Sequence, residues 1–119
     1  MIIKSLGNVA GFEAGDASFL RELLHPGKEP LAIGCSLAHA AVESGATTLP
    51  HRLKSAEVYY VLEGRGRMHI GSEQAEVGPG DAVYIPPGAV QFIANAGPGR
   101  LSFLCIVEPA WTPEDEEVL

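Results

Sequence analysis

The sequence predicts a single all-β domain folded as a closed or nearly closed barrel, and three observations lead to that fold class. The chain has 119 residues, which is enough for one hydrophobic core but not for two independent ones. Its 14 glycines and nine prolines interrupt short runs rich in Val, Ile, Leu, Phe and Tyr, as the turns of a sandwich or barrel do. No run of helical length has a helical period before the C-terminal tail, and no internal repeat is present, so helical bundles, solenoids and propellers are disfavoured.

The expected strands follow one another along the chain and are separated by turns rich in glycine and proline. They are Phe19–Leu24, Leu31–Val42, Glu57–Leu62, Gly66–Ile70, Gln74–Val77, Ala82–Ile85, Gln91–Ala94 and Leu101–Val107. Short runs of β-branched and aromatic residues bounded by such turns are the sequence signature of strands. The predicted domain therefore occupies residues 1–119.

The two ends of this domain are less regular than its middle. Residues 1–18 are weakly patterned, and Ile2-Ile3 is a candidate edge strand that pairs within the barrel or, swapped, with another subunit. Residues 109–119 form a C-terminal tail. There Thr112 is placed to cap a short helical turn and Pro113 to occupy its first position, and the acids that follow favour a helix N-terminus.

Charge and composition exclude several kinds of partner. The formal net charge is −7, and the four acids at positions 114–117 supply more than half of it. An acidic domain repels phosphate backbones, so we expect no nucleic acid partner. No apolar run approaches the roughly 20 residues that cross a bilayer, and the N-terminus lacks secretory-signal features, so we expect no membrane partner and a cytoplasmic protein. Cys35 and Cys105 lie in apolar runs and are expected to be buried thiols rather than a disulfide.

Two stretches of the chain carry the residues that point to chemistry. Residues 45–64 read GATTLPHRLKSAEVYYVLEG, and residues 80–95 read GDAVYIPPGAVQFIAN. Side chains two apart on a strand share a face, so His51 and Leu53 point the same way while Arg52 points away. Glu57 begins the next strand, and Gln91 comes from a strand that a barrel brings alongside. We therefore expect His51, Glu57 and Gln91 to converge inside the barrel.

These two stretches resemble the two motifs of the cupin superfamily, in its small single-domain, conserved-barrel form. The matching positions are Gly45, His51, Glu57 and Gly64 in the first motif, and Gly80, Pro86, Gly88 and Asn95 in the second. The chain departs from the family pattern at two histidine positions, which hold Leu53 and Gln91. The resemblance implies a double-stranded β-helix, or jelly-roll barrel, which is often dimeric and carries a metal and a small molecule in its mouth. Gly64, Gly80 and Gly88 are interpreted as turn residues with positive φ or close backbone approach.

The resemblance implies a metal site formed by His51, Glu57 and Gln91. Imidazole and carboxylate ligands suit a divalent ion such as Zn, Ni, Mn or Fe, and the amide oxygen of Gln91 is a weaker donor. His39 lies mid-strand just before the first motif and is the best candidate for a replacement ligand, although a core or surface histidine is the commoner role. A metal-free interpretation stays open, in which His51 and Glu57 form a buried pair and Gln91 is a hydrogen-bond partner of Glu57.

Tyr59 is the candidate acid or hydrogen-bond donor toward a substrate, because it has the parity of Glu57 and should point inward. The expected function is a metal-binding cupin that binds or transforms a small organic molecule, with the metal as Lewis acid. As an enzyme it would be an isomerase or epimerase, a lyase or a cyclase rather than a dioxygenase, whose imidazole-rich site is missing. The alternatives are a metal-free small-molecule binding or sensing module, and a structural protein. The expected partners are a small-molecule ligand and a second copy of the chain in a homodimer.

Overall fold

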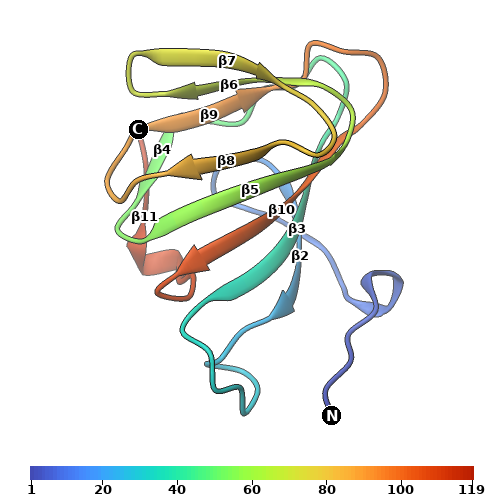
Figure 1. Cartoon of the computed structure of the whole chain (residues 1–119), viewed down its shortest axis with the longest axis vertical. Coiled ribbons are helices and arrows are strands. Elements are labelled where there is room, and N and C mark those ends of the chain that lie inside the picture. The colour runs from blue at the N-terminus through green and yellow to red at the C-terminus, as the bar shows by residue number, and fades with distance from the viewer.

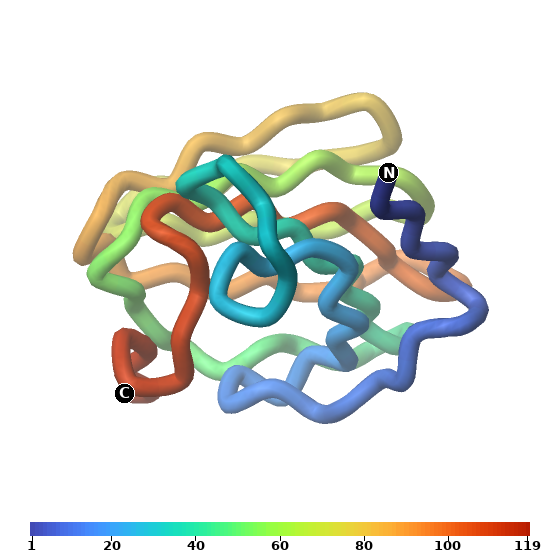
Figure 2. The backbone as a smooth tube through the Cα atoms, turned by 90° about the horizontal axis from the view of Figure 1, so that it is seen from below, coloured from blue at the N-terminus to red at the C-terminus, as the bar shows by residue number.

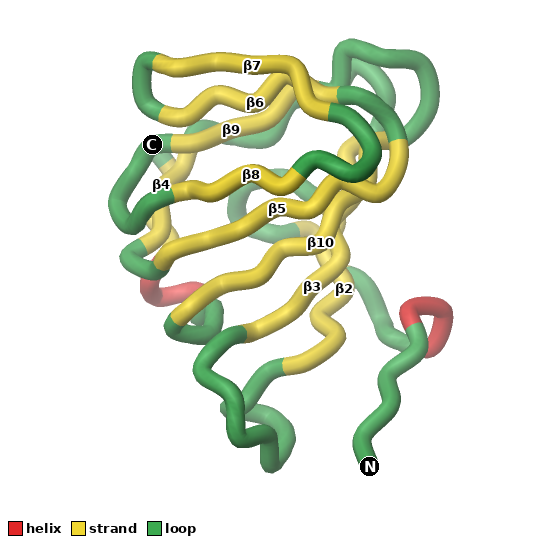
Figure 3. The backbone as a smooth tube through the Cα atoms, in the orientation of Figure 1, coloured by secondary structure: helices red, strands yellow, loops and turns green.

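The computed structural model describes residues 1–119, which form two antiparallel sheets that face each other (Figure 1, Figure 3). The six-stranded sheet has the order β1 (Phe12–Glu13), β2 (Phe19–Leu24), β3 (Ser36–Val42), β10 (Leu101–Glu108), β5 (Ala56–Glu63) and β8 (Ala82–Ile85). The five-stranded sheet has the order β11 (Glu116–Val118), β4 (His51–Leu53), β9 (Gln91–Ala94), β6 (Gly66–Ile70) and β7 (Glu73–Val77). Single 3-10 turns form η1 (Leu6–Asn8) and η2 (Pro113–Asp115). Strands distant in sequence are neighbours in both sheets, and the predicted jelly-roll barrel is confirmed.

Alternation along the strands separates the interior from the surface. On β5, Glu57, Tyr59 and Val61 are buried, whereas Tyr60 and Leu62 are exposed. The core between the sheets includes the fully buried side chains of Phe103, Ile85, Ile93, Leu101 and Val61. At the end of the barrel where the terminal segments pass (Figure 2), the inward-facing residues line a cavity instead.

A glycine turn joins β5 to β6 and shows why the first motif ends in that residue. Gly64 has a φ of +82°, in the left-handed region, and a Cβ atom there would lie 2.5 Å from the carbonyl oxygen of Arg100. Any other residue would therefore be strained and would also meet backbone atoms that cannot move aside. Gly80 and Gly88 also have positive φ, in agreement with their interpretation as turn residues.

Two predicted elements differ from the structure by more than a single residue at an end. The strand expected to begin at Leu31 begins at Ser36, because its partner β10 ends at Glu108 and the next residue, Pro109, has no N–H to continue the ladder. In the tail, the expected helical turn is η2, with Pro113 at its start but no side-chain cap from Thr112. The acids that follow do not extend it, because they form β11 and pair with β4.

Both terminal segments contact the barrel at the cavity end (Figure 2). Ile2-Ile3 forms no strand, and the N-terminal edge strand is β1, which pairs with β2. In the other sheet, the edge strand β11 pairs with β4. No helix in the structure combines the length and apolar character needed to cross a membrane.

Candidate functional site

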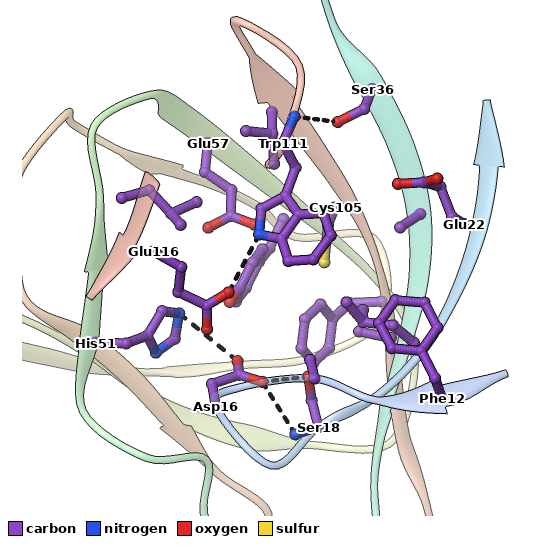
Figure 4. Close-up of a pocket in the computed structure, with 18 residues that line it drawn as sticks. Phe12, Asp16, Ser18, Glu22, Ser36, His51, Glu57, Cys105, Trp111 and Glu116 are labelled. Atoms are coloured by element: carbon purple, nitrogen blue, oxygen red, sulfur yellow. Dashed lines mark hydrogen bonds and ion pairs between the residues drawn. The ribbon is translucent and has the colours of Figure 1, made fainter. Parts of the chain in front are cut away.

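A cavity inside the barrel is lined by His51 and Glu57 of the first motif and by polar residues from other segments (Figure 4). Its wall is mostly apolar and includes the side chain of Leu53, which occupies the first missing histidine position. The volume open to the centre of a water molecule is about 40 Å³. One water needs roughly 10–15 Å³ on this measure, so the cavity accepts a few waters or a molecule of a few non-hydrogen atoms without rearrangement.

His51 presents one free ring nitrogen to this cavity. Its Nδ1 lies 2.8 Å from the backbone carbonyl oxygen of Leu49. A carbonyl oxygen only accepts hydrogen bonds, so Nδ1 carries the proton and the neutral ring keeps its lone pair on Nε2. Nε2 lies 3.6 Å from Oδ2 of Asp16, whose other oxygen accepts from the backbone N–H and the hydroxyl of Ser18 at 3.0 and 2.6 Å. Asp16 is therefore held with its free oxygen facing Nε2 of His51.

Glu57, Gln91 and Tyr59 form a hydrogen-bonded chain across the two sheets. Gln91 Nε2 donates to Glu57 Oε1 at 2.9 Å, and the Tyr59 hydroxyl donates to Gln91 Oε1 at 3.0 Å. Strand alternation points all three inward, and β4 sets His51 directly beside Gln91 in the sheet. The three residues predicted for the site thus converge in the interior, with Gln91 as the hydrogen-bond partner of Glu57.

Burial raises the pKa of two residues in this hydrogen-bonded chain, Glu57 and Tyr59. Glu57 is only 6% exposed, and desolvation raises its pKa to about 8, with a contribution from the nearby Asp16 and Glu116 and an opposing one from the Gln91 hydrogen bond. At neutral pH its carboxyl is therefore largely protonated. Burial, and then Glu57, raises the pKa of Tyr59 well above its usual range. The hydroxyl of Tyr59 is thus a neutral donor that is engaged by Gln91, and its role toward a substrate stays a prediction.

Glu116 is a cavity residue that the sequence analysis missed. The indole N–H of Trp111 donates to its Oε2 at 3.1 Å, while Oε1 is buried and has no hydrogen-bond partner. Burial, and then the proximity of Asp16, raises the pKa of Glu116. Figure 4 shows its carboxyl group between Trp111 and the His51–Asp16 pair. It belongs to β11, whose alternation is too short to stand out in an acidic tail.

Asp16, the other missed residue, comes from the N-terminal segment. It lies in a loop in which Ala17 has a φ of +73°, an uncommon conformation for a residue other than glycine. The only signal in the sequence is the Asp-x-Ser spacing of Asp16 and Ser18, which permits a local turn. Such turns are common, and nothing in the sequence connects this one with a site 35 residues further along at His51.

The predicted metal ligands do not assemble a metal centre of the family type. No three His, Cys, Asp or Glu side chains lie close enough together to hold a metal ion. Leu53 offers no donor, and the Gln91 amide oxygen is engaged by Tyr59 while its NH₂ group faces Glu57. His39 lies on the opposite face of β3 from the cavity-lining Ala38 and Ala40, and does not line the cavity. The replacement ligand expected at that position is therefore outside the site.

Comparisons with known proteins agree with this architecture. Residues 38–107 match the family model described as a cupin domain. An uncharacterized protein of Methanocaldococcus jannaschii is 45% identical over 105 residues, which cover 87% of this chain and 83% of the relative. A glucose-6-phosphate isomerase of Thermococcus kodakarensis is 31% identical over 97 residues, covering 77% of this chain and 47% of the relative. The chain thus spans about half the length of that isomerase.

Solved structures share the fold at lower identity. A predicted oxalate decarboxylase of Thermotoga maritima superposes with a TM-score of 0.79 at 20% identity, covering 91% of this chain and 99% of the other. The nucleoside dehydratase Pac13 of Streptomyces, also solved with uridine, superposes with a TM-score of 0.77 at 18% identity, covering 100% of this chain and 91% of the other. At these identities the likeness establishes the fold alone.

Proposed function

The chain belongs to the cupin domain family, and on that premise we propose that it binds a small organic molecule in the barrel cavity and transforms it by proton transfer. In this proposal His51 is the base, Glu57 is the acid, and no metal step is involved. Isomerisation, dehydration and cyclisation all need a proton removed at one atom and delivered at another. This is the chemistry for which a base and an acid on one cavity are suited.

The observation that carries the proposal is the contrast between two buried groups on one wall. His51 keeps a lone pair on Nε2, because its Nδ1 proton is held by Leu49, and Asp16 stands ready to stabilise the cation formed when Nε2 takes a proton. Glu57 holds its proton at neutral pH, because its pKa is raised to about 8. Pairs of titratable groups whose surroundings favour opposite roles are the usual sign of an acid and a base.

The comparisons support the reaction class and not the substrate. One relative is named as an isomerase, and one structural neighbour as a dehydratase. Isomerase or epimerase, lyase and cyclase chemistry therefore remain favoured over oxygen chemistry. A binding or sensing module without catalysis is the alternative, and it predicts binding without proton exchange.

A solvent-exchange experiment tests the proposal. The protein is incubated in D₂O with dihydroxyacetone, lactaldehyde and aminoacetone, and the loss of carbon-bound proton signals is followed by ¹H NMR. We expect exchange with at least one of the three compounds, reduced about 10²–10⁴-fold in Glu57→Gln and in His51→Gln. Glu76→Gln, on the exposed strand β7, is the matched control and should exchange at the wild-type rate. Exchange that survives both cavity substitutions would refute the assignment.

The divalent metal predicted from the resemblance, Zn, Ni, Mn or Fe, is the competing proposal. In its favour, His51 has the free Nε2 and fixed Nδ1 typical of a ligand histidine. Bound there, a metal would act as Lewis acid on an oxygen of the substrate. Elemental analysis of protein purified without an affinity tag decides between the two. About one ion per chain, lost in His51→Ala, would favour the metal, whereas exchange unchanged by chelator treatment favours direct proton transfer.

We also propose that the chain forms a homodimer through the outer face of the six-stranded sheet. Tyr84 is 63% exposed there, and Tyr60 and Leu62 are exposed on the adjoining strand. Leu104 lies beside Tyr60 on the same face. An exposed apolar patch of this kind is typical of an association surface. Light scattering should give the mass of two chains for wild type and of one chain for Leu62→Lys, whereas a monomeric wild type would contradict the proposal. The cytoplasmic location stays a prediction.

A further inference from the structure

The ionisable groups on the cavity wall are strongly biased toward one sign. Four carboxyl groups line it, from Asp16, Glu22, Glu57 and Glu116, and no Lys or Arg does. Of these, Glu22 has a cationic partner in Lys28 outside the cavity, and Asp16 faces His51. Glu57 and Glu116 have no ion-pair partner in the protein. A phosphate or carboxylate group entering this cavity would meet repulsion with no compensating cation.

The cavity also has more acceptors than donors. Oε1 of Glu116 is buried without a hydrogen bond. The remaining Oδ2 of Asp16 is 3.6 Å from His51 Nε2, beyond hydrogen-bond distance. A buried acceptor without a donor is costly, so these oxygens favour a ligand that supplies N–H groups and positive charge.

Aromatic rings form the other walls of the same cavity. Phe12 and Trp111 lie with ring centroids 6.4 Å apart, and Tyr59 packs on Phe103 at 4.3 Å. All four rings line the cavity. Aromatic faces attract organic cations and do not attract phosphate. Carboxyl groups together with aromatic walls are therefore complementary to a protonated amine that carries a short apolar part.

We propose that the cavity recognises a small organic ammonium ion, whose N–H groups are received by Asp16 and Glu116. This proposal rests on the proposed function, since it assigns recognition of the substrate to those two residues and leaves proton transfer to His51 and Glu57. The small cavity volume restricts an unrearranged fit to an amine of a few non-hydrogen atoms. The same wall disfavours a sugar phosphate, so the glucose-6-phosphate isomerase relative would share the barrel but not the ligand.

Trp111 makes a direct binding experiment possible, because it is the only tryptophan of the chain and it lines the cavity. The protein is titrated with methylammonium and ethanolammonium chloride, and separately with inorganic phosphate, oxalate, glycerol and zinc chloride, at constant ionic strength. We expect a saturable change of Trp111 fluorescence with at least one ammonium ion, and no saturable change with phosphate, oxalate or glycerol.

Two variants and a control locate the effect. Glu116→Gln and Asp16→Asn should each weaken ammonium binding about 10-fold or more, because each removes a charge-assisted hydrogen bond. Glu114→Gln, an exposed acid on the same tail, should bind as wild type does. Thermal unfolding with and without ligand repeats the comparison by a readout that does not depend on the indole, which contacts Glu116 directly.

Several outcomes would overturn the proposal. Tighter binding of phosphate, oxalate or glycerol than of either ammonium ion would do so, as would zinc binding with no ammonium response, or ammonium binding that survives both substitutions. The two proposals fail separately. Ammonium binding without any proton exchange in D₂O would contradict the proton-transfer function alone. Proton exchange on dihydroxyacetone with no ammonium binding would contradict the ligand assignment alone.

Discussion

The motif strands and the terminal segments contribute to one cavity in different ways. His51, Glu57 and Gln91 lie on regular strands, where alternation decides which side chains point inward. Asp16 and Glu116 arrive from a loop and from a short edge strand at opposite ends of the chain. In the functions proposed above, the strands supply the acid and the base, and the two terminal segments supply the charges that distinguish one ligand from another.

The largest expected effect concerns the motif acid and the pH dependence of stability. The pKa of Glu57 is about 8 in the folded protein and 4.5 as its ordinary value, so the folded state holds the proton more tightly than the unfolded state. The resulting stabilisation is fully present below about pH 4.5 and is lost as the pH rises through about 8. The free energy of unfolding should therefore fall on the order of 4 kcal/mol more in wild type than in Glu57→Gln between pH 5 and 9.

Urea unfolding at a series of pH values measures this difference. The pKa of Glu116 is also raised, so its ionisation lowers the free energy of unfolding with rising pH in the wild type and in Glu57→Gln alike. Asp16 and His51, which lie near it, are present in both proteins. The comparison with Glu57→Gln therefore isolates the motif residue. Parallel stability curves for the two proteins would show that Glu57 is ionised in the folded state at neutral pH.

The hydrogen-bonded chain gives the next largest effect. Gln91→Leu leaves the carboxyl of Glu57 and the hydroxyl of Tyr59 without their partners in the interior. We expect the free energy of unfolding to fall by about 2–3 kcal/mol. Gln74→Leu removes an amide that accepts only from Arg67 on an exposed strand, and should change it by less than about 0.5 kcal/mol. Equal effects at the two positions would mean that the interior chain does not form.

Removing the charge of Glu116 should stabilise the protein, which is not expected for an ordinary surface acid. Glu116 is half-buried, and Asp16 is near it, so Glu116→Gln removes repulsion when both are charged. At pH 8 we expect a gain of about 0.5–1 kcal/mol, reduced by solvent screening, and almost none at pH 4. The exposed Glu114→Gln serves as the control. A loss of stability at pH 8 would indicate that Glu116 has a cationic partner in solution.

The last two effects, of about 1 kcal/mol or less, concern backbone conformation in the two regions. Ala17 in the terminal loop and Gly45 in the first motif both have positive φ, +73° and +80°. Ala17→Gly should gain about 0.5 kcal/mol, and Gly45→Ala should lose about 1 kcal/mol. Thermal unfolding resolves both signs. A destabilised Ala17→Gly variant would mean that the loop holding Asp16 is not strained.

The same division explains what could be predicted from the sequence. Turn residues bound the strands Gly66–Ile70, Ala82–Ile85 and Gln91–Ala94 tightly, and their limits agree with the structure. The alternation of side chains along the strand correctly predicted that Glu57 and Tyr59 point inward. It could not orient His39, because its neighbours in SLAHAAV are apolar or small on both faces of the strand. The strand was expected to begin at Leu31 because an apolar run begins there. The first residues of that run lie in a loop, because the partner strand β10 ends at Glu108, before Pro109.

Asp16 and Glu116 could not be found in this way, since their position depends on packing between segments 100 residues apart. Hydrophobic periodicity carries no information about such a tertiary contact. The sequence also could not show that Gln91, predicted as a metal ligand, would instead join a hydrogen-bonded chain. Gln91 and Tyr59 each allow several partners, and only the facing of β9 and β5 selects the one observed.

The pairing of β11 with β4 also bears on the order in which parts of the molecule form. β11 follows every other strand in the chain, so the two sheets can assemble before this short edge strand docks. Glu116 reaches the cavity only when β11 docks, and the cavity wall is therefore completed after the barrel that surrounds it.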